Sequence, residues 1–416
     1  MTLSSIHDQN RQAVDSQGPA RLPVPVYLLA VGTFLMLTTE FIVAGILPDI
    51  AADLKISLAD AGTLITVFAA GMVVGAPTMA MATRRISPRL TLILALLIFA
   101  AGHAIVALCA NFTVLLAARF VTALATGAFW AVASVVAARL APAGMTSRSL
   151  GVVTAGGMLA TVLGVPLGAF FAQLAGWRGS FGALGLLALV AAILIWRGLP
   201  EIHTSKHHVP LRAEFAALRS KRLWLALAAC ATTTGGVLAA YSYVSPLLTQ
   251  TAGFHAGTVP WILAVFGIGS FIGTLLGGRV GDRHPHMLTV IVPTFTVLFL
   301  TTMLLTAHSP LVLVLALTGL GLVGLSANPV LISLALRYAK NAPTLGSALS
   351  VAAFNLGTMA ASWFGGRSLE SPLGMLGPIV LGIASSVLTL IPVSVLAWRA
   401  RTAYLRQPNA ADTSAS

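Results

Sequence analysis

Glu40 and Arg119 are charged residues that the sequence places inside long apolar runs, over 24–47 and 112–138. An ionisable side chain in hydrocarbon is energetically unfavourable, so its presence there indicates a function. A carboxyl group in an apolar cavity is readily neutralised, whereas a nearby guanidinium favours its ionised form. A pair of this kind is suited to binding a proton on one side of a membrane and releasing it on the other.

The two charged residues are predicted to lie at the same depth. Each lies about seven residues from one end of its run, and at about 1.5 Å per residue both are roughly 10 Å below the same membrane surface. We predict that Glu40 carries the proton and that Arg119 tunes it. Two alternatives stay open, namely a static ion pair that fixes two helices together and separate roles for the two residues.

Composition indicates an all-α integral membrane protein. Hydrophobic residues make up 57% of the 416 and charged residues 8%, against about 25% charged in soluble domains. The mean hydropathy is +0.93. Twelve apolar runs approach the roughly 20 residues that a bilayer requires. The predicted spans are 24–47, 61–82, 90–110, 112–138, 150–173, 180–199, 223–248, 259–281, 287–307, 310–337, 345–367 and 376–398.

The basic residues predict the orientation. If the N-terminus is cytoplasmic, the loops on the opposite side hold Lys55, Arg178 and Arg367, and Arg119 is within a span. The other twenty of the twenty-four Lys and Arg residues are then cytoplasmic, which is a strong positive-inside bias. The net charge of +13 is distributed in short clusters between apolar runs, which argues against nucleic-acid binding. We expect a multi-pass protein of the bacterial cytoplasmic membrane with both termini in the cytoplasm.

The longest loop divides the chain into two six-helix halves. We expect an N-terminal tail over 1–23, a first half over 24–199, a cytoplasmic linker over 200–222, a second half over 223–399 and a tail over 400–416. The linker sequence LRAEFAALRSKR fits a short interfacial helix, with a solvated linker as the alternative. In each half, glycine followed by basic residues comes after the second span, in 75–89 and in 277–283. This internal similarity is typical of transporters.

Small residues recur at every fourth position in two of the spans. Such ladders let helix backbones approach closely in a membrane. The first ladder is Gly156, Ala160, Gly164, Gly168 and Ala172, and the second is Gly269, Gly273, Gly277 and Gly281.

Several motifs resemble the major facilitator superfamily, and within it the twelve-span drug:proton antiporters. They are TTEFIVAGILPDIA (38–51), GAPTMAMATRRISPR (75–89), LLAARFVTALATGAFWA (115–131), ATVLGVPLG (160–168), GWRGSF (176–181) and AAFNLG (352–357). Within this group, the chain is most similar to chloramphenicol exporters and arabinose-type sugar efflux permeases. One departure is that no acidic residue lies between Gly75 and Arg89, whereas the second-half copy has Asp282.

The resemblance implies the arrangement of the helices. Spans 1, 4, 7 and 10 would line a central cavity, and span 2 with span 11 and span 5 with span 8 would pack between the halves. Close helix packing would involve Gly164, Pro166, Gly168, Gly273 and Gly277. A cytoplasmic gate would involve Arg84, Arg85, Asp282 and Arg283.

Few polar or aromatic side chains are available to bind a substrate in the predicted cavity. A mostly apolar pocket with a few polar groups suits a small, neutral or lipophilic solute. For each hydroxyl, a bond to its own helix is the alternative. The candidates are Thr38, Thr39, Trp130, Tyr241, Tyr243, Asn328 and Asn355.

The sequence lacks the motifs of ATP-driven pumps and common hydrolases. No lysine follows a glycine, so there is no Walker-A loop, and HExxH and GxSxG are absent. We therefore expect no enzyme activity, cofactor or metal site. The predicted function is export of a drug such as chloramphenicol, or of a sugar, in exchange for protons by a monomer in the lipid bilayer. Proton-coupled uptake and a non-transporting sensor remain as alternatives.

Overall fold

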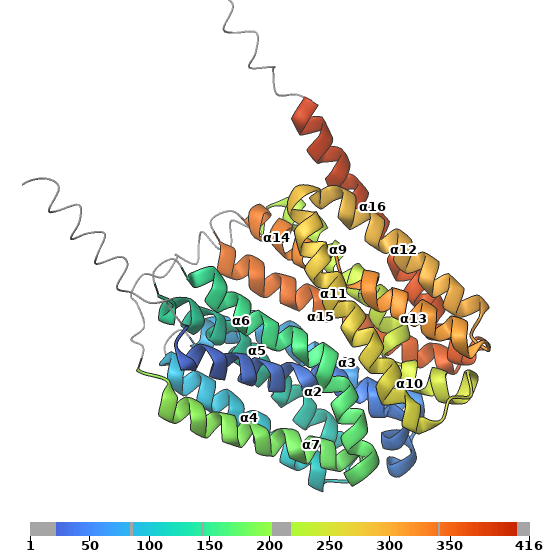
Figure 1. Cartoon of the computed structure of the whole chain (residues 1–416), viewed down its shortest axis with the longest axis horizontal. Coiled ribbons are helices and arrows are strands. Elements are labelled where there is room, and N and C mark those ends of the chain that lie inside the picture. Colours follow the sequence, from blue (N-terminus) through green and yellow to red (C-terminus); the bar gives the residue numbers. More distant parts are fainter. Residues whose placement is uncertain (1–21, 84–85, 143–144, 202–217, 340–341, 406–416) are drawn as a thin grey trace, which may run out of the picture.

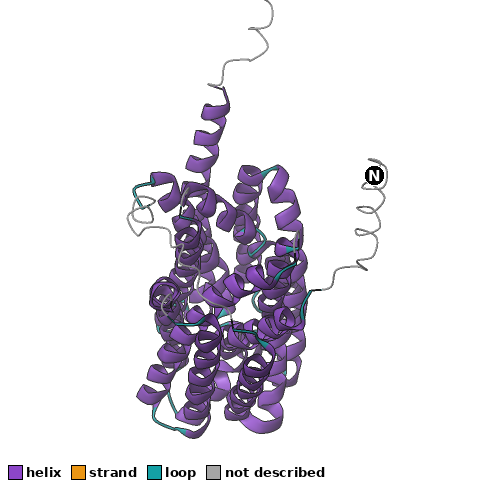
Figure 2. Cartoon of the chain, turned by 90° about the vertical axis from the view of Figure 1, so that its left-hand side faces the viewer, coloured by secondary structure: helices purple, strands orange, loops and turns teal. Residues whose placement is uncertain are grey.

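The computed structural model describes residues 22–83, 86–142, 145–201, 218–339 and 342–405. Within these ranges the chain forms helices and loops and no strand (Figures 1 and 2). In the first half the helices are α2 (Val24–Leu54), α3 (Leu58–Ala82), α4 (Pro88–Leu108), α5 (Phe112–Leu140), α6 (Thr146–Leu159), η2 (Ala160–Gly164) and α7 (Val165–Gly198). In the second half they are α9 (Lys221–Tyr241), α10 (Val244–Pro246), η3 (Leu247–Thr251), η4 (Ala256–Thr258), α11 (Val259–Arg283), α12 (Pro285–Leu305), α13 (Pro310–Gly324), α14 (Asn328–Ala339), α15 (Pro343–Leu369), η5 (Gly374–Leu376) and α16 (Gly377–Leu405).

Local sequence signals determine where many of these helices begin. The side chains of Ser57, Ser87, Asn111 and Ser220 each accept a hydrogen bond from a backbone N–H in the first turn of the following helix. Such caps satisfy donors that have no partner within the helix. Proline at the first or second position begins several other helices, where its missing N–H has no cost. The cap that Asn111 provides therefore explains why the predicted spans 90–110 and 112–138 are separated by this residue alone.

Eleven helical stretches of the described chain are long and apolar enough to span a membrane, and one of them spans it twice. The stretch Arg148–Gly198 contains 51 residues, more than twice the length that a bilayer requires. Gly176 interrupts it with a φ of 71°, a conformation that glycine adopts readily. Ser180 Oγ then donates a hydrogen bond of 2.8 Å to the carbonyl of Gly168. Residues twelve apart in a straight helix are about 18 Å apart, so the chain reverses here and spans 5 and 6 are separate, as predicted.

Three of the spans contain irregular helix. A π-helical turn, η2, ends two residues before Pro166, which has no N–H to donate to the preceding turn. Span 7 breaks between α9 and α10 at Ser242 and Tyr243, and span 10 breaks between α13 and α14 just before Asn328 and Pro329. Irregular backbone at membrane depth is tolerated where it is buried in protein or lines a cavity. These breaks are therefore structural markers of the interior of the helical bundle.

Close glycine contacts follow the same pattern in both halves. Span 2 packs on span 4 and span 5 on span 1, while span 8 packs on span 10 and span 11 on span 7. Adding six to each span number in the first half gives the contacts of the second half, because spans 2 and 4 correspond to spans 8 and 10, and spans 5 and 1 to spans 11 and 7. The halves are therefore pseudo-symmetric. The contacts join Gly71 to Ala123, Gly75 to Leu124, Gly156 to Ala30, Gly168 to Ile42, Gly273 to Leu322, Gly277 to Ser326, Gly357 to Ala231 and Gly365 to Tyr243.

The two most extensive contacts between the halves are those predicted, and α10 and α11 also touch α2. Span 2 packs along span 11 as α3 against α15, and span 5 meets span 8 where η2 and α7 contact α11. Figure 1 shows α11 and α15 at the border between the blue-to-green half and the yellow-to-red half. At the second border, Gly267 of α11 lies against the backbone of Thr161 and Val162. The glycine ladders do make close contacts, as predicted, but Gly164, Gly168, Gly273 and Gly277 face helices of their own half.

The halves are hydrogen-bonded at the end where α3 begins and α15 ends. Ser362 Oγ of α15 donates to the carbonyl of Gly62 in α3 over 2.9 Å. Within the second half, Tyr243 Oη donates to the carbonyl of Ser362 over 2.7 Å. At the same end, Gln173 Nε2 of α7 donates to the carbonyl of Ala256 in η4 over 3.1 Å. The structure is therefore closed at this end of the bundle.

Ser362→Ala is expected to open this end more often. Ser362 and Ser350 lie on the same helix and are each 1% exposed, but Ser350 Oγ bonds only within α15. A net loss of about 1 kcal/mol on removing the hydroxyl that joins the halves corresponds to roughly a fivefold population shift. Maleimide labelling of a cysteine at Ala61, in a background without Cys109 and Cys230, should accelerate by about that factor with Ser362→Ala. Equal acceleration by Ser350→Ala would show that the bond to Gly62 is not responsible.

Candidate functional site

Arg119 is buried, with 1% of its surface exposed, and its guanidinium joins several helices. Nη1 donates to the carbonyl and to Oγ1 of Thr39 in α2 over 3.0 and 2.7 Å, and Nε donates to the carbonyl of Leu64 in α3 over 3.4 Å. The guanidinium also stacks on Phe68, 4.2 Å from the ring centroid. Arg119 thus meets span 1 at the residue before Glu40, in agreement with the predicted depth.

Thr39 extends this network to α4. Its Oγ1 lies 2.8 Å from Nε2 of His103, and Nδ1 of His103 lies 2.8 Å from the carbonyl of Phe99. Because a carbonyl only accepts, Nδ1 carries a proton and donates it. The Thr39 hydroxyl accepts from Arg119 and has its own proton to donate to Nε2. The neutral Nδ1–H tautomer of His103 therefore satisfies both ring nitrogens and the Thr39 hydroxyl. Nη2 of Arg119 is buried and has no partner among the described residues.

Glu40 lies near the middle of α2 and remains partly exposed. Within the part of the chain that the structure describes, its carboxyl group forms no hydrogen bond and no ion pair, and the described ion pairs are Arg178–Asp53 and Arg367–Glu370. The direct pair of Glu40 with Arg119 that the sequence permits is thus not formed. Arg119 does fix span 4 against span 1, as the static alternative requires, but it does so through Thr39.

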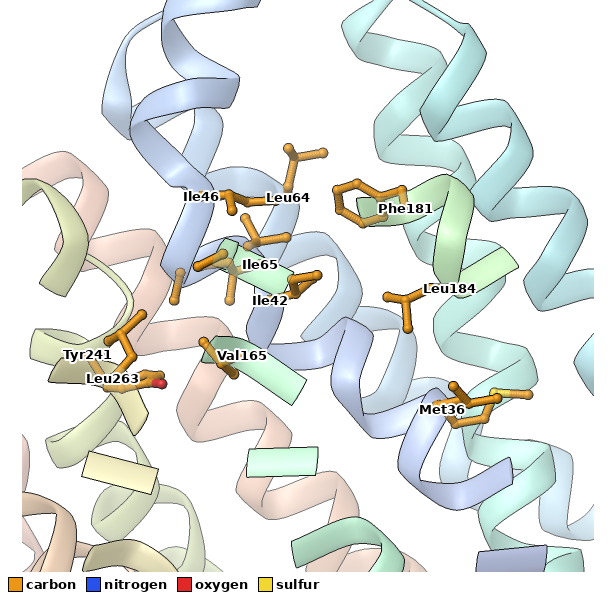
Figure 3. Packing of buried hydrophobic residues seen from close by; sticks show 14 of the residues in the cluster. Met36, Ile42, Ile46, Leu64, Ile65, Val165, Phe181, Leu184, Tyr241 and Leu263 are labelled. Carbon is orange, nitrogen blue, oxygen red and sulfur yellow. The ribbon is translucent and has the colours of Figure 1, made fainter. Parts of the chain in front are cut away.

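Three of the predicted cavity residues have buried polar atoms without a partner among the described residues. These atoms are Oη of Tyr241, Oδ1 of Asn328 and Oδ1 of Asn355, all in the second half. A buried polar atom without a hydrogen bond is rare in native proteins and requires an explanation, such as a ligand or water. Ser270 of α11 has the same property, and the sequence analysis missed it because its only signal was a hydroxyl among glycines. Leu263 and Val165 both lie against Gly45 of α2, and Figure 3 labels Tyr241 in the same cluster of buried residues.

The remaining cavity candidates have other neighbours. Thr38 bonds to its own helix and lies against Gly164, and Thr39 is taken up by Arg119 and His103. Tyr243 already bonds Ser362 at the closed end. Trp130 of α5 is partly exposed and lies near Gly157. Substrate contact by these four residues stays a prediction.

The predicted gate is described in part. Asp282 and Arg283 end α11 and are exposed, and Asp282 lines a hollow of about 120 Å³ between α11 and α14. Arg84 and Arg85 lie outside the described residues, as do most of the linker and both tails. A latch between these groups stays a prediction.

Comparison with known proteins decides the family. The model described as Major Facilitator Superfamily matches residues 29–362. The chain belongs to the major facilitator superfamily. It is a multi-pass membrane transporter and not an enzyme, as predicted. Its relatives include the chloramphenicol resistance protein of Streptomyces lividans, which is 36% identical over 361 residues, covering 86% of this chain and 92% of that protein.

Two further similarities extend over most of the chain. The putative transporter AraJ of Escherichia coli (strain K12) is 30% identical over 393 residues, covering 92% of this chain and 96% of AraJ. A solved structure of a bacterial homologue of the human lysosomal transporter Spinster, in an inward-facing and occupied conformation, has a TM-score of 0.68. It covers 93% of this chain and 98% of its own, with 17% sequence identity. This structural similarity confirms the fold of the superfamily.

Proposed function

We propose that this transporter exports a small, neutral or lipophilic organic compound in exchange for protons by alternating access. The observation that carries the proposal is the state of Glu40, an unpaired and partly exposed carboxyl group in the middle of a membrane-spanning helix. The other described acidic residues lie in loops or within the first or last two turns of helices. An accessible carboxyl group without a fixed partner can take up and release a proton, whereas Arg119, which bonds Thr39 and Leu64 through Nη1 and Nε, is better suited to positioning span 1.

The proposed substrate contacts are the unpaired polar atoms of Tyr241, Asn328 and Asn355 in the second half. Tyr241 stacks on Phe266, with ring centroids 4.4 Å apart, and offers its unpaired hydroxyl. Asn328 and Asn355 add two carbonyl oxygens that can each accept a hydrogen bond. Few polar groups among apolar side chains favour a lipophilic compound over a sugar. The chloramphenicol resistance protein among the relatives supports the same substrate class.

The topology and domain division form part of this proposal. We place both termini in the cytoplasm of a bacterial cell and the protein in the cytoplasmic membrane, and we retain 24–199 and 223–399 as the two halves that move against each other. The closed end then faces outward. We propose that it works as a monomer. Uptake in the same direction as protons is the second candidate, since an outward-closed carrier serves either direction.

A susceptibility panel tests the proposal. Cells that express the protein should tolerate chloramphenicol or another lipophilic compound at higher concentrations than cells without it, and a protonophore should abolish the difference. Increased sensitivity, with faster accumulation of the compound, would instead support uptake. An unchanged response to every compound, with no change in accumulation, would contradict both.

Tyr241→Phe is expected to weaken substrate binding without destabilising the fold. A lost hydrogen bond of about 1 kcal/mol should raise the substrate concentration for half-maximal transport roughly fivefold. Because the Tyr241 hydroxyl is buried and unpaired, its removal should leave the melting temperature unchanged or higher. Tyr243→Phe is the matched control, since it removes a hydroxyl that bonds Ser362. Tyr243→Phe should lower the melting temperature. If Tyr243→Phe instead weakens substrate binding and Tyr241→Phe lowers the melting temperature, the substrate binds at Tyr243.

A further inference from the structure

Four basic side chains from three helices line one hollow at the end of the second half opposite the closed end. Lys221 and Arg222 begin α9, Arg337 lies near the end of α14 and Arg399 lies on α16. We call these four residues the basic basin. The hollow has a volume of about 510 Å³ and adjoins another of about 200 Å³, which the three arginines share with His286 of α12. Spaces of this size admit a small polar group.

The basin cations have no acidic partner among the described residues. The arginines near the closed end differ in this respect, because Arg178 pairs with Asp53 and Arg367 with Glu370. Positive charges that converge on one hollow repel each other, and the repulsion grows as water is excluded. An anion bound in the basin would relieve this repulsion and hold the ends of α9, α14 and α16 together.

Two further features of the basin attract an anion. The N-terminal end of α9, at Lys221, carries the partial positive charge of a 21-residue helix. In the adjoining hollow, Nδ1 of His286 is buried and has no partner among the described residues. A buried polar atom of this kind is normally satisfied by a bound group.

The depth of the basin matches that of lipid headgroups. Trp224 follows Arg222 by two residues and is 53% exposed, and Trp398 directly precedes Arg399 and is 65% exposed. Exposed tryptophans gather at the boundary between hydrocarbon and water. Tyr338 lines the same hollows and adds a third aromatic ring. The basin therefore opens where the phosphates of a membrane leaflet lie.

We propose that the basic basin binds the phosphate headgroup of an anionic phospholipid. Guanidinium groups bind phosphate oxygens through paired, charge-assisted hydrogen bonds, and three arginines around one hollow can surround such a group. Basic pockets between membrane-spanning helices recognise lipid headgroups in this way. The bound lipid would join α9, which begins the second half, to the ends of spans 10 and 12.

Native mass spectrometry of the full-length protein, released from nanodiscs containing equal amounts of phosphatidylglycerol and phosphatidylcholine, tests the proposal. The wild type should retain phosphatidylglycerol in preference to phosphatidylcholine. The double variant Arg222→Gln with Arg399→Gln should retain roughly 30-fold less, because two cations near the membrane surface are lost. The matched control Arg197→Gln with Arg279→Gln removes two exposed arginines outside the basin and should retain as much as the wild type.

Three outcomes would overturn the proposal. Equal losses in the two double variants would indicate attraction to overall surface charge, and equal retention of the two lipids would exclude recognition of an anionic headgroup. Displacement of phosphatidylglycerol by millimolar inorganic phosphate would assign the basin to a soluble anion. If the basin double variant does not yield a monodisperse protein, the single variant Arg337→Gln, at an exposed position, provides the same comparison against Arg279→Gln.

Discussion

Glu40→Gln is expected to abolish proton-driven accumulation of substrate while leaving the protein folded. Glutamine keeps the size and polarity of a protonated glutamic acid but cannot release a proton. Because Glu40 forms no hydrogen bond or ion pair with a described residue, the change removes no hydrogen bond or close ion pair between the helices. In everted vesicles, one proton exchanged per substrate molecule supports about a tenfold substrate gradient for each pH unit imposed. The variant should reach no gradient.

Exchange of substrate without a gradient provides the control for this prediction. Labelled and unlabelled substrate should still exchange across vesicles that contain Glu40→Gln, since the variant resembles the protonated carrier. Glu40→Asp retains a titratable group and should preserve part of the accumulation. Accumulation by Glu40→Gln at the level of the wild type would rule out Glu40 as the proton carrier. The described helices offer no second acid at that depth, so proton coupling itself would then be in question.

The relation between Glu40 and Arg119 marks the limit of what the sequence could predict. Counting residues from helix ends gives depth, and Arg119 does reach α2 at that depth. The direction of a side chain around its helix depends on the neighbouring helices, however. Thr38 and Thr39 are adjacent in sequence but about 100° apart around α2, so one faces Gly164 and the other faces Arg119 and His103. Only the packed structure distinguishes these two threonines.

The spans were predictable because each needs only length and apolarity. All twelve agree with the helices to within a few residues at most ends. The exceptions are α2, which continues to Leu54 beyond the predicted end at residue 47, and α16, which continues to Leu405 beyond the predicted end at residue 398. The breaks in spans 7 and 10 were not predicted, because proline at 246 or 329 is also compatible with a continuous, kinked helix in a membrane. The partners of the glycine ladders were also beyond the sequence, since spacing indicates a close contact without identifying the second helix.

Gly277→Ala is expected to destabilise the protein strongly, although it adds a single methyl group. A Cβ at Gly277 would collide with the backbone carbonyl of Ser326, at the break between α13 and α14. Backbone cannot turn away as a side chain can, so α11 would have to move, and overpacking of this kind costs about 1–3 kcal/mol. The adjacent Gly278 meets nothing within 4 Å, and alanine there should stabilise the helix by about 0.5–1 kcal/mol. The two neighbouring substitutions should thus change the melting temperature in opposite directions, measured on protein purified in one detergent.

A comparison with Gly267→Ala separates packing within a half from movement between halves. Gly267 lies on the same helix as Gly277 but faces a different neighbour. It meets the backbone of Thr161 and Val162 across the border between the halves. Two bodies that move against each other can relieve a collision by separating, whereas α11 and α13 within one body cannot. Gly267→Ala should therefore change the labelling rate of a cysteine at Ala61 more than it changes the melting temperature, and Gly277→Ala should do the reverse. Equal effects of both substitutions on both measurements would mean that α11 does not border two independently moving halves.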